Sequence, residues 1–311
     1  MKIFTLTLNP AFDIHASLPS FLVEHENLAS SVSRDIGGKG VNISRALNAN
    51  GIPNLVLVVL GEENGSEFKS KLEAEQISYK AISVPGRIRE NITIHPDGGK
   101  ETRLSFKGFE STPDVLDNVG GLLDINSGDI VTFTGSLPVG MDEESAVEFL
   151  LSLRERGVKL VIDSKSIGID SIRRVKPWLI KPNEEELVAY IGTASEADAR
   201  DFLIALSSDV ENVLVSLGAR GALLASGGRV ISACAPKIDA KSTIGAGDSM
   251  IAGFIAAEYS LLWDEDRNAS EALRLAVAFG SAACLTEGTN PPRHTDIRTL
   301  KRQVLINEID S

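Results

Sequence analysis

The chain has 311 residues, with 31 lysines and arginines against 43 aspartates and glutamates, which gives a formal net charge of −12 at pH 7. This acidic balance argues against a protein that binds the phosphate backbone of nucleic acid, and any anionic ligand must be met by positive groups gathered locally. The length allows one large domain with a small appendage, or two ordinary domains.

Hydropathy and cysteine usage argue against a membrane-spanning protein and against a disulfide-stabilised one. The longest apolar runs, such as Leu55–Leu60, fall far short of the roughly 18 to 20 residues that cross a bilayer, so no membrane partner is expected. The two cysteines, Cys234 and Cys284, lack C-x-x-C spacing and are too few for a disulfide framework. We therefore predict a reduced, cytoplasmic protein.

Two stretches predict a small β lid. From Ala11 to Asp35, and again from Tyr79 to Gly108, polar and apolar residues alternate with period two and no helical pattern intervenes. The second stretch contains Pro96-Asp97-Gly98-Gly99, and an Asp-Gly pair in a short turn is typical of a β-hairpin. We expect a lid formed from about residues 11–35 and 79–108. An antiparallel extension of the main sheet is the alternative.

A glycine-rich turn, Asp35-Ile36-Gly37-Gly38-Lys39-Gly40-Val41-Asn42, precedes a predicted helix over Ile43–Asn50. Small residues let a ligand approach the backbone, Lys39 supplies a point charge, and Asn42 can both donate and accept hydrogen bonds with sugar hydroxyls. The chain contains no G-x-x-x-x-G-K-[ST] sequence, so this turn is not a P-loop. We interpret it as a site for a hydroxyl-bearing ligand. A plain strand-to-helix turn with a solvated lysine is the alternative.

The middle of the chain predicts an α/β core. Short apolar, β-branched runs alternate with longer amphipathic segments, which is typical of parallel strands joined by crossover helices. We expect a doubly wound sheet covered by helices on both faces, within a single domain over residues 1–311 that carries the lid as an insertion. The predicted strands include Leu55–Leu60, Ile130–Phe133, Lys159–Ile162, Trp178–Ile180 and Val213–Ser216.

The segment Lys181-Pro182-Asn183-Glu184-Glu185-Glu186-Leu187 directly follows the strand that ends at Ile180. Ligands bind open α/β sheets at the carboxyl ends of their strands. Asn183 and Glu186 are three residues apart, so on a first helical turn they face the same side and can organise hydrated Mg²⁺ near nucleotide phosphates. A capping box explains the same spacing without any function.

The most informative stretch is Ser242-Thr243-Ile244-Gly245-Ala246-Gly247-Asp248-Ser249-Met250, which leads into an apolar segment that ends at Ala257. Backbone N–H groups at a helix start have no intrahelical partner, and the helix dipole adds partial positive charge, so this turn can hold a phosphate. Asp248 in the first helical turn is placed to take a proton from a hydroxyl that attacks the phosphate. The alternative is a glycine-rich turn with Asp248 as an ordinary helix cap.

Together with Asn9-Pro10-Ala11-Phe12-Asp13 and Gly135-Ser136-Leu137-Pro138, these motifs resemble the PfkB (ribokinase-like) carbohydrate kinase family across nearly the whole chain. Gly-Gly-Lys-Gly-x-Asn and Asn-Pro-x-x-Asp resemble its phosphosugar branch, which contains 1-phosphofructokinase, tagatose-6-phosphate kinase and a minor 6-phosphofructokinase. The resemblance implies a three-layer αβα ribokinase-like (Rossmann-like) fold and Mg²⁺- and ATP-dependent phosphorylation of a hexose phosphate. Fructose 1-phosphate is the favoured acceptor, with tagatose 6-phosphate and fructose 6-phosphate as alternatives.

The resemblance also implies a role for each matching residue. Asp248 is the expected catalytic base, and the amides of Gly245, Ala246 and Gly247 form the expected anion hole. The expected substrate-binding residues are Asp13, Gly38, Asn42 and Ser136 for the sugar, with Lys39, Arg89 and Arg103 for its phosphate. The expected ATP-binding residues are Lys181, Asn183, Glu186, Ser216, Gly218 and Gly221, with Glu186 reaching Mg²⁺ indirectly through water.

The expected partners are therefore ATP and a phosphorylated hexose, with no nucleic acid and no membrane. A lid with exposed β edges can pair with a second copy, so we also expect a homodimer through the lid. Two functions of other classes are the alternatives: a non-catalytic sugar-phosphate sensor and a nucleotide-dependent oxidoreductase. The intact Asp248 beside its glycine turn argues against the sensor, and no G-x-G-x-x-G follows the first strand.

Overall fold

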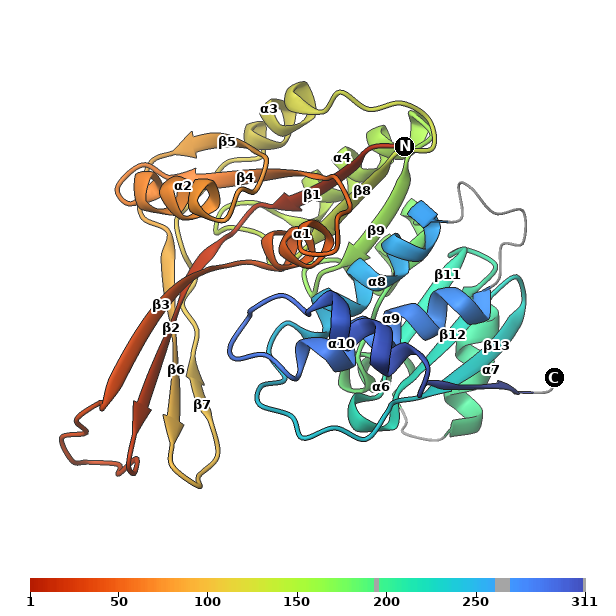
Figure 1. Cartoon of the computed structure of the whole chain (residues 1–311). Helices are drawn as coiled ribbons and strands as arrows, with labels where there is room; N and C mark the ends of the chain where they lie inside the picture. Colours follow the sequence, from red (N-terminus) through yellow and green to blue (C-terminus); the bar gives the residue numbers. More distant parts are fainter. Residues whose placement is uncertain (193–195, 261–268, 310–311) are drawn as a thin grey trace.

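The body of the protein is built on one large twisted sheet (Figure 1). The computed structural model describes residues 1–192, 196–260 and 269–309. The sheet has ten strands in the order β14-β13-β12-β11-β10-β9-β8-β1-β4-β5. The strands from β11 to β5 run parallel, and β12 to β14 add an antiparallel edge. The strands are β1 (Ile3–Thr7), β4 (Leu55–Gly61), β5 (Tyr79–Val84), β8 (Ile130–Thr134), β9 (Lys159–Asp163), β10 (Leu179–Ile180), β11 (Asn212–Ser216), β12 (Ala222–Ser226), β13 (Arg229–Cys234) and β14 (Leu305–Ile309).

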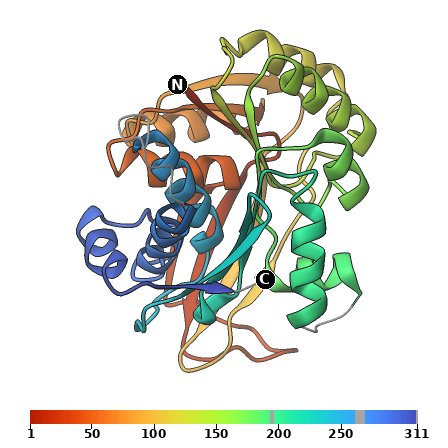
Figure 2. The same ribbon diagram turned by 90° about the vertical axis from the view of Figure 1, so that its right-hand side faces the viewer.

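Helices cover both faces of this sheet, which confirms the predicted α/β architecture. Figure 2 shows the yellow-to-green helices on one side of the sheet and the blue helices on the other. Each side has its own apolar core, because the parallel strands carry nearly continuous apolar residues that point alternately to the two faces. The helices are α1 (Lys39–Asn48), α2 (Gly65–Ala74), α3 (Asp114–Leu122), α4 (Glu143–Glu155), α5 (Ile169–Val175), α6 (Glu184–Ile191), α7 (Glu196–Leu206), α8 (Ala246–Ser260), α9 (Ala269–Ala283) and α10 (His294–Lys301).

The lid is a second, four-stranded sheet that projects from the body (Figure 1). Its strand order is β3-β2-β6-β7, formed by β2 (Ala11–Leu18), β3 (Ser31–Gly37), β6 (Arg89–Pro96) and β7 (Thr102–Leu104). Residues 79–84, which the alternating pattern places in the lid, instead form β5 beside β4, with Tyr79 opposite Val56. An edge strand of the main sheet is solvent-exposed on part of its surface, so its residues alternate in the same way as those of a lid strand.

Helices α8 and α9 pack closely against each other at a glycine. A Cβ atom added at Gly253 of α8 would lie 2.8 Å from the Leu275 carbonyl oxygen and 2.9 Å from the Ala276 Cα in α9. Both contacts are with backbone, so the two helices would have to move apart. Among the described residues, none of the helices combines the length and apolar character needed to span a bilayer.

We therefore expect Gly253→Ala to lower the free energy of unfolding by about 1–3 kcal/mol, the usual cost of overpacking a core. Urea denaturation measures this loss. Gly121→Ala is the matched control, because a Cβ atom at this helical glycine meets nothing within 4 Å. Equal changes in the free energy of unfolding in the two variants would show that the packing of α8 against α9 leaves room for a Cβ atom at position 253.

Candidate active site

The predicted catalytic base is buried where α8 begins. Asp248 lies in the first turn of this helix, as expected from the sequence, and only 6% of its surface is exposed. Its Oδ2 accepts a hydrogen bond of 2.8 Å from the Asn42 side-chain amide. Helix α1 begins at Lys39, earlier than the predicted start at Ile43, so Asn42 projects from a helical turn and orients the carboxylate.

The environment of Asp248 suits a general base at neutral pH. Burial raises the pKa of Asp248 to about 6, and the charge of Asp163 acts in the same direction. The charges of Lys39 and Lys181 and the hydrogen bond from Asn42 oppose this rise in the pKa. The side chain is therefore ionised at pH 7 and close to the range in which a general base is most effective.

Asp163 is a buried charged residue of this site that the sequence did not reveal. It is the last residue of β9, and its buried carboxylate lies 2.9 Å from the Lys39 ammonium and 3.7 Å from that of Lys181. Burial disfavours the charged form of Lys39, but the carboxylates around it, led by Asp163, outweigh burial and raise the pKa of Lys39. The available signal was an aspartate at the carboxyl end of a predicted parallel strand, where ligands bind.

The glycine turn before α8 has the geometry expected of an anion-binding helix start. Gly245 has a positive φ of 77°, and the Ala246 amide makes only a long bond of 3.3 Å to the Thr243 carbonyl. A Cβ atom on Gly247 would lie 3.1 Å from the Lys181 Nζ. The Lys181 ammonium thus lies against the backbone of the turn. The helix dipole and this side-chain charge both contribute positive potential at the place where an anion would bind.

A second group of charges lies on the lid. The buried Asp13 carboxylate accepts hydrogen bonds from Arg103 at 2.9 Å and from Asn91 at 3.1 Å. A Cβ atom on Gly37 would lie 2.0 Å from its Oδ2, so the carboxylate fills the space that this glycine leaves open. Asn91 was not predicted as a site residue, and it forms part of this group because it lies opposite Asp13 on the neighbouring strand β6.

Two predicted substrate residues make contacts at the base of the lid. Arg89 donates to the carbonyls of Phe106 and Asn9, both at 3.0 Å, so in this conformation it holds backbone segments together. Burial lowers the pKa of Arg89, and the neighbouring Arg103 charge does the same while Asp13 opposes both. Ser136 accepts a hydrogen bond of 3.2 Å from the Asn9 side chain.

The turn between β3 and α1 joins the lid charges to the predicted catalytic base. Gly37 contacts Asp13, and five residues later Asn42 contacts Asp248. Gly38 caps α1 with a φ of 130°, a conformation that favours glycine, and its missing Cβ would meet Thr7 at 2.6 Å. Residues 37–42 therefore link the two groups, because one end of this short segment contacts Asp13 and the other end contacts Asp248, with Gly38 between them.

The predicted nucleotide residues also converge, at the carboxyl ends of β10 and β11. Asn183 pairs with Ser216 through an isolated parallel bridge, and Gly218 and Gly221 have φ values of 58° and 106° in the loop that follows. The capping-box alternative is present: the Glu186 amide donates to Asn183 at 2.8 Å, and Glu186 Oε2 accepts from the Asn183 amide at 2.9 Å. The other oxygen of Glu186 lies 3.8 Å from Lys165.

Comparison with known proteins gives consistent results. The model of the pfkB family carbohydrate kinases matches residues 8–296. The chain is similar to 1-phosphofructokinase of Escherichia coli K12, with 32% identity over 291 residues, covering 91% of this chain and 90% of the relative. It is 31% identical over 316 residues to 1-phosphofructokinase of Borreliella burgdorferi, covering 99% of both chains. Among solved structures, phosphofructokinase-2 from Escherichia coli in complex with substrates and products superposes with a TM-score of 0.90 at 27% identity, covering 97% of this chain and 99% of the other.

Proposed function

Because this chain belongs to the pfkB family of carbohydrate kinases, we propose that it transfers the terminal phosphate of ATP to fructose 1-phosphate, forming fructose 1,6-bisphosphate and ADP. Two similar proteins are named 1-phosphofructokinase, and they support this choice of acceptor. The observation that carries the proposal is the buried Asp248, oriented by Asn42 beside the glycine turn. Its test is ADP release with fructose 1-phosphate as acceptor.

The acceptor sugar is the part of the proposal that kinetics must decide. Tagatose 6-phosphate and fructose 6-phosphate differ from fructose 1-phosphate in the position of the phosphate, and from each other at one stereocentre. We expect the highest kcat/KM with fructose 1-phosphate. A higher value with either other sugar would reassign the acceptor within the same family. Sugar-phosphate binding without ADP release would instead identify a non-catalytic sensor.

In the proposed mechanism Asp248 removes the proton from the attacking sugar hydroxyl as that oxygen approaches the terminal phosphorus of ATP. The bond to ADP breaks as the new bond forms, and no covalent enzyme intermediate is needed. The amides of Gly245, Ala246 and Gly247, with the adjacent Lys181, stabilise charge on the moving phosphoryl group. Lys39 stays charged beside Asp163 and offsets the negative charge gathered around the base.

Magnesium fits this site as a partner of the nucleotide. Among the described residues, no group of three or more histidine, cysteine, aspartate or glutamate side chains is placed to hold a metal ion. Mg²⁺ keeps several waters and is commonly bound by one or two carboxylates together with substrate phosphates. Glu186 would reach such an ion indirectly, through one of its waters, since one carboxylate oxygen remains outside the capping box. Bound there, Mg²⁺ would neutralise phosphate charge.

The proposed acceptor site lies under the lid. Asp13, Gly38, Asn42 and Ser136 are assigned to the sugar, and Arg103, Lys39 and Arg89 to its phosphate. Arg103 is the strongest candidate for the phosphate, because its side chain is 40% exposed and only one of its nitrogens is bound to Asp13. ATP is assigned to Lys181, Asn183, Glu186, Ser216, Gly218 and Gly221.

The raised pKa of Asp248 predicts the pH dependence of the reaction. Below its pKa of about 6 the carboxylate is protonated and cannot accept the hydroxyl proton. We expect kcat/KM to fall about tenfold for each pH unit below that value and to level off above it. Initial rates in buffers of constant ionic strength measure this profile. A rate independent of pH between 5 and 7 would exclude Asp248 as the group that titrates.

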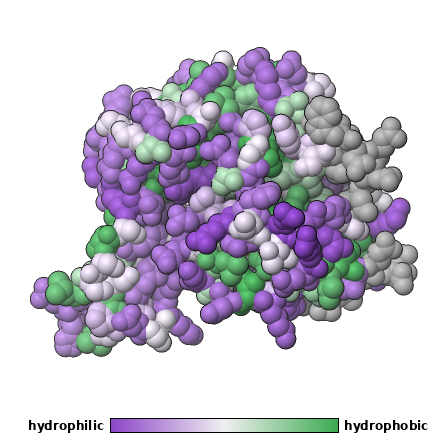
Figure 3. Space-filling model, viewed as in Figure 1, coloured by the Kyte–Doolittle hydropathy of each residue, from purple (hydrophilic) through white to green (hydrophobic). Residues whose placement is uncertain are grey.

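We also propose that the enzyme is a homodimer joined through its lids. The lid has a polar face with Asp13 and Arg103 and an apolar face, on which Val32 and Leu104 are 64% and 48% exposed. Figure 3 shows hydrophobic residues on the projecting lid. A related structure is described as the tetrameric form of Escherichia coli phosphofructokinase-2, which shows that this relative forms oligomers. Covering such a face is a common way to protect an exposed sheet.

This interface is tested by charge insertion. The wild-type protein should have a light-scattering mass of twice 33.2 kDa. Val32→Glu with Leu104→Glu should give monomers, because charges opposite one another in an apolar interface are strongly unfavourable. Leu305→Glu, at an exposed leucine on β14 away from the lid, should remain dimeric. A monomeric wild type would refute the dimer. A cytoplasmic location likewise stays a prediction from cysteine usage.

A further inference from the structure

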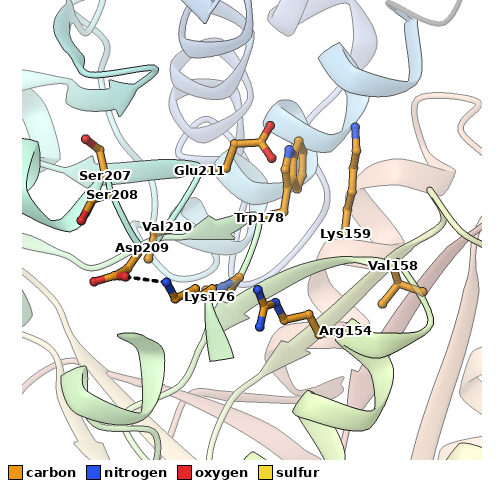
Figure 4. A pocket seen from close by; sticks show the side chains of 12 residues that line it. Arg154, Val158, Lys159, Lys176, Trp178, Ser207, Ser208, Asp209, Val210 and Glu211 are labelled. Atoms are coloured by element: carbon orange, nitrogen blue, oxygen red, sulfur yellow. Dashed lines mark ion pairs between the residues drawn. The ribbon is translucent and has the colours of Figure 1, made fainter. Parts of the chain in front are cut away.

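A cavity lies at the amino ends of three parallel strands, whereas the candidate active site lies at their carboxyl ends. Figure 4 shows the residues that line this cavity. Its volume is about 420 Å³, and it is lined by residues that precede three neighbouring strands: Lys159 opens β9, Trp178 precedes β10 and Glu211 precedes β11. The other ends of these strands carry Asp163, Lys181 and Ser216. A molecule in this cavity would therefore not compete for the same space as ATP or the hexose phosphate.

Positive side chains gather at this cavity in an otherwise acidic chain. Arg154, Lys159 and Lys176 line it, together with two carboxylates, Asp209 and Glu211. Lys176 is paired with Asp209 at 3.1 Å, as Figure 4 shows. The Arg154 guanidinium has no hydrogen bond or ion pair within the part of the chain that the structure describes. Arginine presents a planar fork that matches phosphate, so Arg154 is available for an anion.

The backbone at Lys176, one of the residues that line the cavity, is in a strained conformation. Lys176 ends α5 with a φ of 53° and a ψ of 62°, the left-handed conformation in which glycine is usual. A non-glycine residue there destabilises the fold, and such strain is concentrated at functional sites. Glycine is the usual residue in such a cap, although a cation near a helix C-terminus also complements the helix dipole. A lysine instead places an ammonium at the rim of the cavity.

One wall of the cavity is held rigidly. Trp178 is buried, its ring lies 5.4 Å from that of Phe254 in α8, and the Lys159 ammonium lies 5.2 Å from the indole centre. Lys159 also forms an ion pair with Glu258 of α8. The indole therefore fixes the position of Lys159 at the cavity and presents only a small exposed edge to a ligand.

We propose that this cavity binds a small phosphorylated polyol, at a site separate from the ATP and hexose-phosphate sites. Arg154 and Lys176 bind the phosphate, and Asp209 and Glu211 accept hydrogen bonds from hydroxyl groups. The buried Trp178 holds this wall of the cavity in place. A volume of about 420 Å³ lies within the range of small-molecule sites.

The test is equilibrium dialysis of the whole protein against radiolabelled glycerol 3-phosphate, with glycerol as the uncharged comparison. We expect saturable binding of glycerol 3-phosphate in the millimolar range and none of glycerol. Arg154→Ala should raise the dissociation constant about tenfold or more, the usual effect of removing a charge-assisted hydrogen bond. Arg156→Ala, an exposed arginine just after the same helix, should leave it within about twofold.

A second variant separates the ligand role of Lys176 from its structural role. Lys176→Gly should raise the melting temperature, because glycine adopts this backbone conformation freely, while it weakens glycerol 3-phosphate binding. Gln76→Gly is the matched control: Gln76 also has a positive φ, of 56°, and should raise the melting temperature without changing binding. Absence of saturable binding, equal binding of glycerol, or a loss of binding with Arg103→Ala but not Arg154→Ala would overturn the proposal.

Discussion

Replacing Asp248 with asparagine is expected to lower kcat by about 10²- to 10⁴-fold, the contribution typical of a general base. Asparagine has the same shape and can still pair with Asn42, but it cannot accept the hydroxyl proton. Binding of ATP and hexose phosphate should be retained, so dissociation constants from calorimetry should stay within about threefold of wild type while turnover collapses. Ser249→Ala, at the next residue of the same buried turn, is the control for local disruption.

The same substitution should make the folded protein more stable at neutral pH. The pKa of Asp248 is higher in the folded state, at about 6, than in an unfolded chain, where an aspartate titrates near 3.8. The folded state therefore binds more protons between those values, and stability falls as the pH rises through that window. Asp248→Asn removes this cost, on the order of 1–3 kcal/mol at pH 7. A lower melting temperature for this variant would show that the ionised carboxylate is stabilised by its surroundings.

Arg103→Ala should have the second-largest effect, and a different kinetic signature. Losing a charge-assisted hydrogen bond to the acceptor phosphate costs about 1.5–3 kcal/mol, so the KM for the hexose phosphate should rise about 10- to 100-fold. The KM for ATP should not change, because Arg103 projects from the lid. Asp13 keeps its hydrogen bond from Asn91, which limits structural damage.

Arg87→Ala is the matched control for the lid arginine. Arg87 is more exposed than Arg103, and it pairs with Glu90 at 3.0 Å, not with Asp13. This variant should keep the wild-type KM for both substrates. If Arg103→Ala also leaves the acceptor KM unchanged, the phosphate of the sugar is bound elsewhere, and Lys39 would be the next residue to test.

Local sequence patterns were sufficient to predict the parallel core and the start of α8. A glycine turn followed by an apolar segment specifies a helix start from its own residues, which placed Asp248 in the first turn. The start of α1 was predicted four residues too late. The reason is that Gly38 adopts a φ of 130° and is the N-cap of the helix. Lys39 and Gly40, which have the composition of a loop, are therefore already the first two residues of α1.

Contacts that depend on strand order could not be read from the sequence. The Lys39–Asp163 pair joins residues 124 positions apart, and it forms because β9 lies near β1 in the sheet, with only β8 between them. Asn91 reaches Asp13 for a similar reason, since β2 and β6 pair in parallel. The assignment of β5 failed because period-two alternation describes any half-exposed strand, whichever sheet it joins.

The most direct test of the account is a crystal structure of Asp248→Asn with ATP, Mg²⁺ and fructose 1-phosphate, which the slowed reaction should allow to be trapped. We expect the free terminal hydroxyl of the sugar within about 3 Å of the side chain at position 248 and in line with the terminal phosphorus of ATP. A sugar bound with every hydroxyl distant from residue 248, or a nucleotide whose terminal phosphate lies away from the Gly245–Gly247 turn, would contradict it.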